Sequence, residues 1–327
     1  RTAASEVCTI VARGVRGSTA ADHDEDDAVP LVKTYANINV VDVIKDMLTG
    51  TDPVGRPYAG VPASFIPAAW DTERDEWLTH AKIFETDISE PIGITKLINE
   101  LVQQFLLKIW VDERVQQIQL QALKPPGPSV KTLDDDSGLI DNSVDVKDDP
   151  KQRISRVYVH YDPHNDIDFD EWKHFKRHVL LIDADAESAQ EYGEKRIKEI
   201  FSRWLTVGNA GAVSALTGRL ISRYRDNPLV ISLQYDAKDS DLWTGDLFNV
   251  RSRQLQQISG NDATRLFEIT SVAEDVDKFK VRAVSSDFVG RYGFIGPNTL
   301  GEYSVESAAN KAAYGFIAPN SGFFADG

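Results

Sequence analysis

Apolar residues repeat with a helical period most clearly between residues 94 and 106. They occupy the i, i+3, i+4 and i+7 positions of one helix face, as Ile94, Leu97, Ile98, Leu101, Val102 and Phe105. The following segment predicts a β-hairpin. KIWV is followed by turn residues at 112–114, and then Ile118, Leu120 and Ala122 alternate with glutamines. One face of this hairpin is therefore expected to be buried and the other wet.

Two shorter helices are expected upstream. Asn39 has the side chain of a helix N-cap, and Gly50 is the expected end of that helix. The apolar face between them consists of Val40, Val43, Ile44, Met47 and Leu48. A Pro- and Gly-rich loop at 51–62 then interrupts the pattern. A second short helix is predicted around Trp70 and Trp77.

Two consecutive helices are predicted over 185–226, where they form an αα-hairpin. The first begins at Asp185, and its expected buried stripe consists of Ala189, Gly193, Ile197, Ile200 and Trp204. The second, at about 211–225, presents Val213, Leu216, Leu220 and Tyr224 and ends before Pro228.

After residue 228 the apolar period changes from 3.6 to two. Leu229, Ile231, Leu233 and Tyr235 alternate with other residues, which is typical of a strand. Further strands are expected at 247–252, 265–272 and 279–284, and an earlier one at 153–161. We therefore predict an antiparallel meander over 229–284 that forms a sheet or closes into a small barrel.

Changes in composition divide the chain into domains. KPPGPS at 124–129 indicates a boundary. We therefore predict an α+β domain over 1–126 and a second domain over 127–285, which holds the αα-hairpin and the meander. The predicted fold class is α+β, with antiparallel β-barrel or meander domains and inserted helices.

The last segment, 286–327, contains an internal repeat. YGFIGPN at 292–298 recurs as YGFIAPN at 314–320. A segment of this size is near the lower limit for folding alone. We predict a docking tail, whose aromatic residues pack on the preceding domain, on a neighbouring subunit, or on sequence that follows Gly327.

Composition excludes several classes of protein. The chain has 327 residues, with 36 Lys and Arg against 51 Asp and Glu, and a net charge of −15. This acidic balance argues against tight nucleic-acid binding, which needs clustered cations. The single cysteine, Cys8, excludes an internal disulfide and a Cys-based metal site. No apolar run reaches 18 residues, so no membrane-spanning segment is predicted.

The N-terminal stretch to about Val32 contains an acidic run at 22–27, which is typical of a solvated loop. The sequence opens with Arg1 rather than Met. We expect a processed or excised part of a longer polypeptide, or a chain that lacks its ends.

The sequence has none of the standard enzyme motifs that we sought. The phosphate-binding patterns G-x-G-x-x-G and G-K-[ST] and the nucleophile elbow G-x-S-x-G are absent. Cys8 lies in the apolar segment VCTIVA, which is typical of a buried, inert thiol. We therefore assign no catalytic, cofactor-binding or metal-binding residue, expect no cofactor and do not predict an enzyme.

Four histidines are candidate metal ligands. His160 and His164, and likewise His174 and His178, have the i, i+4 spacing of helical zinc ligands. RVYVHY predicts a strand rather than a helix there, and neither pair has the HExxH base. We interpret them as ordinary surface histidines. The acidic loop 162–171 lacks an EF-hand glycine, so we expect a solvated loop, with a weak calcium site as the alternative.

Several segments resemble a known family. They are VDVIKDMLT (41–49), YAGVPASFI (58–66), AAWDTERDEWL (68–78), EPIGITKLINEL (90–101), WVDERVQQIQLQAL (110–123) and RLISRYRDNPLVISLQYDAKDSDLWTGDLFNV (219–250). Together they resemble the central tail hub or tail-tip proteins of long-tailed bacteriophages, which include J-like host-specificity proteins and baseplate hubs. The resemblance covers about 38–290 and includes no catalytic signature.

The resemblance implies a structural virion protein at the distal end of the tail. Such proteins are similar to tail-tube subunits and form homotrimers whose β-barrel domains make a ring that caps the tube. The implied partners are the tail tube, distal tail proteins, the tape-measure protein and receptor-binding or fibre proteins. The implied roles are host attachment and genome passage. An acidic wall would let a polyanion such as DNA slide past.

Two other hypotheses remain open from the residues. One is a cell-wall hydrolase at the tail tip that uses a carboxylate pair or the histidine cluster. The other is a hub subunit of a non-viral injection device.

Overall fold

The computed structural model describes residues 32–52, 55–88, 92–123, 128–164, 169–189, 192–239, 241–256 and 260–286, and two short strands at 316–317 and 324–325. Its α-helices are α1 (Val40–Thr49), α2 (Ala69–Trp77), α3 (Ile94–Gln104) and α4 (Ala210–Tyr224). Short 3-10 turns are η2 (Ala63–Phe65), η3 (Pro150–Gln152), η4 (Trp172–His174), η5 (Val207–Asn209) and η6 (Ala237–Asp239).

The strands are distributed along the described chain. They are β1 (Lys33–Asn39), β2 (Lys82–Ile88), β3 (Leu107–Asp112), β4 (Gln117–Ala122), β5 (Lys131–Asp134), β6 (Asp145–Asp148), β7 (Arg156–Pro163), β8 (Phe175–Ile182), β9 (Ile197–Phe201), β10 (Leu229–Asp236), β11 (Leu247–Gln256), β12 (Asp262–Asp275), β13 (Lys278–Ser285), β14 (Phe316–Ile317) and β15 (Phe324–Ala325). Most pairs are antiparallel, whereas β9 runs parallel to β7 and β5 parallel to β11.

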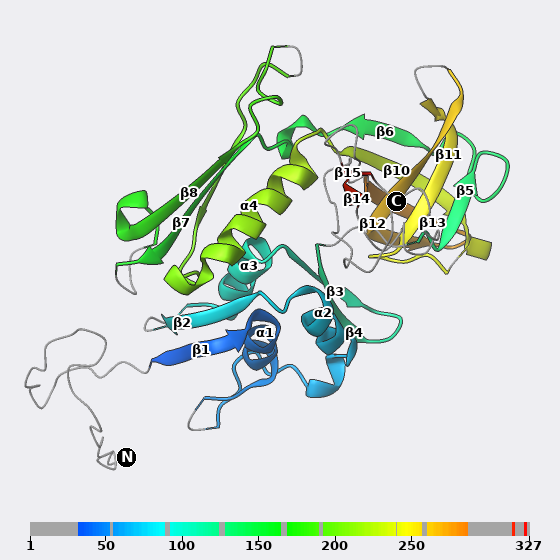
Figure 1. Cartoon of the computed structure of the whole chain (residues 1–327). Coiled ribbons are helices and arrows are strands. Elements are labelled where there is room, and N and C mark those ends of the chain that lie inside the picture. The colour runs from blue at the N-terminus through cyan, green and yellow to red at the C-terminus, as the bar shows by residue number, and fades with distance from the viewer. Residues whose placement is uncertain are drawn as a thin grey trace, which may run out of the picture.

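Figure 1 shows three groups of elements. Helices α1, α2 and α3 lie with the β1–β2 pair and the β3–β4 hairpin. A three-stranded sheet in the order β8–β7–β9 extends alongside α4, and a six-stranded sheet lies apart from it (Figure 1). This arrangement leaves β8 at an outer edge of its sheet.

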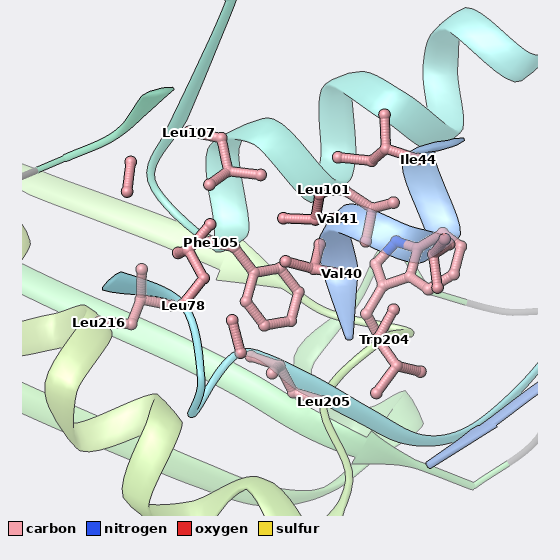
Figure 2. Packing of buried hydrophobic residues seen from close by; sticks show 14 of the residues in the cluster. Val40, Val41, Ile44, Leu78, Leu101, Phe105, Leu107, Trp204, Leu205 and Leu216 are labelled. Atoms are coloured by element: carbon pink, nitrogen blue, oxygen red, sulfur yellow. The ribbon is translucent and has the colours of Figure 1, made fainter. Parts of the chain in front are cut away.

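The first hydrophobic cluster joins the helices to the three-stranded sheet. Asn39 begins α1, because its Oδ1 accepts a hydrogen bond from the backbone N–H of Val41 at 3.0 Å. Val40, Val41 and Ile44 of α1 then pack with Leu101 and Phe105 of the α3 region and with Trp204, as Figure 2 shows. The cluster also includes buried residues of β7 and α4, so it extends from Tyr35 to Ile221.

Several predicted elements are confirmed. The helices expected after Asn39, around Trp70, at 94–106 and at 211–225 are α1, α2, α3 and α4, and the expected hairpin is β3–β4. The strand expected at 153–161 is β7, and those of the meander are β10 to β13. Strands β1, β2, β5, β6 and β8 were not predicted.

The predicted αα-hairpin over 185–226 is wrong, because only its second helix forms. Residues 184–189 make a turn, Gly193 adopts a left-handed backbone with φ +63°, and 197–201 is strand β9. A left-handed residue cannot continue a right-handed helix. The residues of the expected helical stripe are not all buried. Ile200 and Trp204 are buried, whereas Ile197 is 59% exposed.

The second hydrophobic cluster belongs to the six-stranded sheet, ordered β5–β11–β12–β13–β10–β6. Its centre is aromatic and aliphatic, with Tyr235, Phe248, Phe267 and Ile231 each at or near 0% exposure. The predicted meander is confirmed in β11–β12–β13. The predicted barrel is not found, because the described strands end in β5 and β6, which do not pair with each other.

Close contacts join the two clusters. Gly245, with φ +92°, lies so near Trp110 that an added Cβ would come within 2.4 Å of the indole Cζ2. Lys108 of β3 forms an ion pair with Glu268 of β12. The Arg114 guanidinium lies 4.7 Å from the Trp243 ring centre. Only glycine fits at 245, so this junction is tightly packed.

The domain limits at 126/127 and 285/286 stay predictions, because clusters describe packing rather than independent folding. Ten buried residues of the predicted second domain, from Val157 to Ile221, nevertheless belong to the first cluster. Cys8, the acidic run 22–27 and the docking tail lie outside the described residues, except for the paired strands β14 and β15. None of the described helices is long and apolar enough to span a bilayer.

Candidate functional site

Strand β8 and its neighbours expose several large apolar side chains. The last three residues of β8, Leu180, Leu181 and Ile182, are 44%, 38% and 41% exposed. Ile197 at the start of β9 and Trp172 just before β8 are also exposed. Helix α4 packs on β7 and β8 but leaves these side chains in contact with solvent.

Both outer strands of this sheet offer backbone groups for further pairing. Among the described strands, β8 pairs only with β7, in antiparallel register, and β9 pairs only with β7, in parallel register. An edge strand with unpaired N–H and C=O groups can accept another strand. Apolar side chains on such an edge indicate an interaction surface.

Two of the four histidines meet on this sheet. His160 of β7 lies directly opposite His178 of β8, and their Nδ1 atoms are 2.7 Å apart. The His160 Nε2 atom lies 2.8 Å from Glu199 Oε1 of β9. His160 is 5% exposed, so its interpretation as a surface histidine is wrong. The sequence pairs at i, i+4 do not form; strand register decides which histidines meet.

The hydrogen-bond pattern permits at most three protons on the two rings. One ring must donate and the other accept across the Nδ1 contact, so two Nδ1–H groups cannot face each other at this distance. Burial lowers the pKa of His178 below its ordinary value, and the nearby His160 lowers it further. The Phe201 ring stacks on His160 with centroids 4.8 Å apart, so His160 is buried, whereas His178 is exposed.

The arrangement does not fit a metal ion. The two Nδ1 atoms bond to each other, and Glu199 lies on the opposite nitrogen of His160, so the three groups do not converge on one point. Among the described residues, no group of three His, Cys, Asp or Glu side chains could hold a metal. His174 lies elsewhere, with its Nδ1 atom 3.2 Å from Asp170 Oδ1.

The acidic loop is described only in part, since 165–168 lie outside the described residues. Its described carboxylates have cationic neighbours. Asp162 lies 3.4 Å from Arg177, and Glu171 lies 2.6 Å from Lys173. These ion pairs occupy oxygens that a calcium ion would need.

Strand β8 was not predicted, because its sequence, FKRHVLLI, does not alternate apolar and polar residues. Its signal was a run of four apolar residues, Val179 to Ile182, followed by Asp183. Such short apolar runs are consistent with a strand but do not distinguish it from a helix segment.

Comparisons with known proteins give structural neighbours only. No family profile and no curated protein sequence matches the chain. Among solved structures, the chain is similar to the tail protein from Neisseria meningitidis MC58, with 15% identity and a TM-score of 0.44 over 77% of this chain and 68% of that chain.

Two further solved structures are similar. A chain of the native gene transfer agent virion has 16% identity and a TM-score of 0.42, over 62% of this chain and 41% of that chain. The 43 kDa tail protein of prophage MuSo2 from Shewanella oneidensis has 14% identity and a TM-score of 0.40, over 77% and 66%.

Proposed function

We propose that this chain is a structural subunit of a phage-type tail, located at the hub or tip. Three copies form a ring that caps the tail tube, takes part in host attachment and allows genome passage. The segments that resemble tail hub proteins support the proposal. Much of their length folds into α1, α2, α3, the β3–β4 hairpin, α4 and β10, which build the buried cores of the molecule.

The exposed edge of the β8–β7–β9 sheet is the single observation that supports this proposal best. Three consecutive exposed apolar residues on an edge strand favour pairing of this strand with another chain. Pairing of β8 in one copy with β9 in the next copy is head-to-tail, and a head-to-tail contact generates a ring when the rotation closes. Such a ring would cover both edges of every copy.

Charge is consistent with a conduit for DNA. Each chain carries −15, so three copies carry 3 × −15 = −45. A polyanion is repelled from such a wall and stays mobile. The proposed neighbours are the tail tube, distal tail proteins, the tape-measure protein and receptor-binding or fibre proteins, at the distal end of the virion tail.

The test compares a β8 variant with a control variant in assembled particles. Leu180→Lys with Ile182→Lys places two cations on the β8 edge, where they oppose strand addition. We expect particles with few or no capped tails, while the purified chain stays folded. The control is Val276→Lys in the β12–β13 turn, since Val276 is 101% exposed and lies outside the sheet edge. It is expected to assemble normally.

The readouts are the copy number per tail in a particle reconstruction and the circular dichroism of each purified chain. Normal tails with the β8 variant would contradict the role of this edge. A reconstruction with one copy per tail, or with the chain in a peripheral fibre, would contradict the ring itself.

A further inference from the structure

A second surface feature is a cleft of about 510 Å³ next to the junction of the two clusters. It is lined by the end of α3, the start of β3, the η3 segment, the start of β9 and the end of α4. An adjoining cleft of about 280 Å³ shares Lys108, Gln152 and Tyr224 with it. A volume of this order fits a small organic ligand.

The lining of the larger cleft is cationic although the whole chain is acidic. Five of its residues are basic and none is acidic: Lys108, Lys151, Arg153, Arg196 and Lys198. Lys108 pairs with Glu268, and the Glu194 carboxylate lies 3.0 Å from Arg196 and 3.7 Å from Arg153. No described carboxylate forms an ion pair with Lys151 or Lys198. In a chain of charge −15, such a concentration of cations indicates a site for an anion.

Arg153 supplies the buried cation of this cleft. It is 4% exposed. Its Nη2 donates to the backbone oxygen of Glu194 at 2.8 Å, and its guanidinium lies 4.4 Å from the Tyr192 ring centre. Its Nη1 is buried and has no hydrogen-bond partner among the described residues, and the same holds for Arg196 Nε. Unsatisfied buried donors are costly, and an acceptor oxygen from a ligand would satisfy them.

Most of the remaining lining is apolar. Seven residues are aliphatic, among them Leu106, Leu123 and Leu220, and the others are Gln103, Gln152 and Tyr224. Apolar walls favour a ligand with a hydrocarbon or aromatic body, because that body leaves water on binding.

We infer that this cleft binds an organic anion, in which a carboxylate or phosphate group is attached to an apolar body. Arg153 and Arg196 receive the anionic head, Lys151 and Lys198 attract it from the rim, and the apolar side chains cover the body. The inference does not depend on ring assembly, because every lining residue belongs to one chain.

The experiment titrates the purified full chain by calorimetry with four probes. Decanoate and decyl phosphate carry both features of the ligand and separate the two kinds of head group. Decanol has the body without the charge, and inorganic phosphate has the charge without the body. We expect at least one of the two amphipathic anions to bind more tightly than both single-feature probes, and to bind more weakly in 0.5 M NaCl because salt screens the rim charges (about 4 Å Debye length).

A charge variant localises the binding. Lys151→Gln with Lys198→Gln removes two cations from the cleft without changing the buried Arg153. We expect a loss of affinity of about tenfold, which is about 1.4 kcal/mol. The control is Lys176→Gln with Lys238→Gln, which removes the same charge from exposed positions outside the cleft. It should bind like the unchanged chain.

Three outcomes would overturn the inference. They are no binding of either amphipathic anion at millimolar concentration, equal binding of decanol and decanoate with no binding of decyl phosphate above that level, and equal affinity of the cleft variant and its control. Failure of the β8 variants to affect assembly would leave this result untouched, so the two proposals fail separately.

Discussion

The two larger sheets differ in how they end. The six-stranded sheet ends in β5 and β6, each four residues long, and β6 exposes Asp145, Lys147 and Asp148. The three-stranded sheet ends in β8, which is eight residues long and exposes three consecutive apolar side chains near its end. Both are described edges of sheets in the same chain, so solubility alone does not explain the difference.

Short, charged edge strands oppose pairing with other chains, whereas long apolar ones invite it. The six-stranded sheet therefore has the features of an edge that stays in solvent. The β8 edge has the features of an interface. Three predictions test this contrast, in order of decreasing expected effect.

The first prediction concerns β6, the charged edge strand of the six-stranded sheet. Asp145→Val, Lys147→Val and Asp148→Val together give β6 an apolar edge like that of β8. We expect self-association at micromolar concentration, seen as a severalfold rise in mass by static light scattering. The control, Asp145→Asn with Lys147→Gln and Asp148→Asn, makes the same charge change without adding apolar surface. Its mass should equal that of the unchanged chain. Equal masses for the two triple variants would contradict the view that apolar residues on an edge strand promote association.

The second prediction concerns the anchor at the apolar end of β8. Glu187, in the turn after β8, accepts two 2.6 Å hydrogen bonds from Arg156 of β7 and one from Ser155. Arg156 is the β7 residue opposite Ile182. Glu187→Gln removes the charge and should lower the Tm by a few degrees at pH 7, because charge-assisted hydrogen bonds are stronger than neutral ones.

The pKa of Glu187 determines how the Tm difference changes with pH. Hydrogen bonds from Arg156 lower the pKa of Glu187 from about 4.5 to about 2. The folded state therefore holds the charged carboxylate more strongly than the unfolded state does, and the stabilisation is present above about pH 4.5 and lost as the pH falls towards 2. The Tm difference between the two proteins, followed by circular dichroism, should shrink over that range. A difference that stays constant from pH 7 to pH 2.5 would contradict the role of the charge.

The third prediction concerns the histidine pair that joins β7 to β8. The groups that face His178 are His160 from β7, with Glu199 of β9 on its far side, and Trp172 from η4. Because the pKa of His178 is lowered in the folded state, its contribution to stability is present above its ordinary pKa of 6.5 and falls as the pH drops below that value. His178→Gln should make the Tm less dependent on pH between 7 and 5.

Proton NMR of the imidazole C–H signals measures the same effect directly. We expect the His178 signal to titrate below pH 6.5 in the unchanged chain. A titration of His178 at or above 6.5 would contradict the lowered pKa of His178 in the folded state.

Local signals predicted much of the fold. Helix α3 was evident because its apolar residues keep a strict helical period, and α1 because Asn39 caps it and Gly50 ends it. The β3–β4 hairpin and the meander strands followed from alternation with a period of two. In each case the residues that determine the element lie within about a dozen positions of one another, so the sequence itself contains the information.

Tertiary structure decided the rest. Ile197 and Ile200 fit a helical stripe as well as a strand, and the outcome depended on pairing with β7, about forty residues away in the chain. The same pairing brought His160 to Glu199, and the β7–β8 register brought it to His178. The cationic cleft gathers residues from 102 to 224. A sequence pattern defines which face of an element is apolar, but the partner of that face depends on contacts between distant segments, and these form only when the chain is packed.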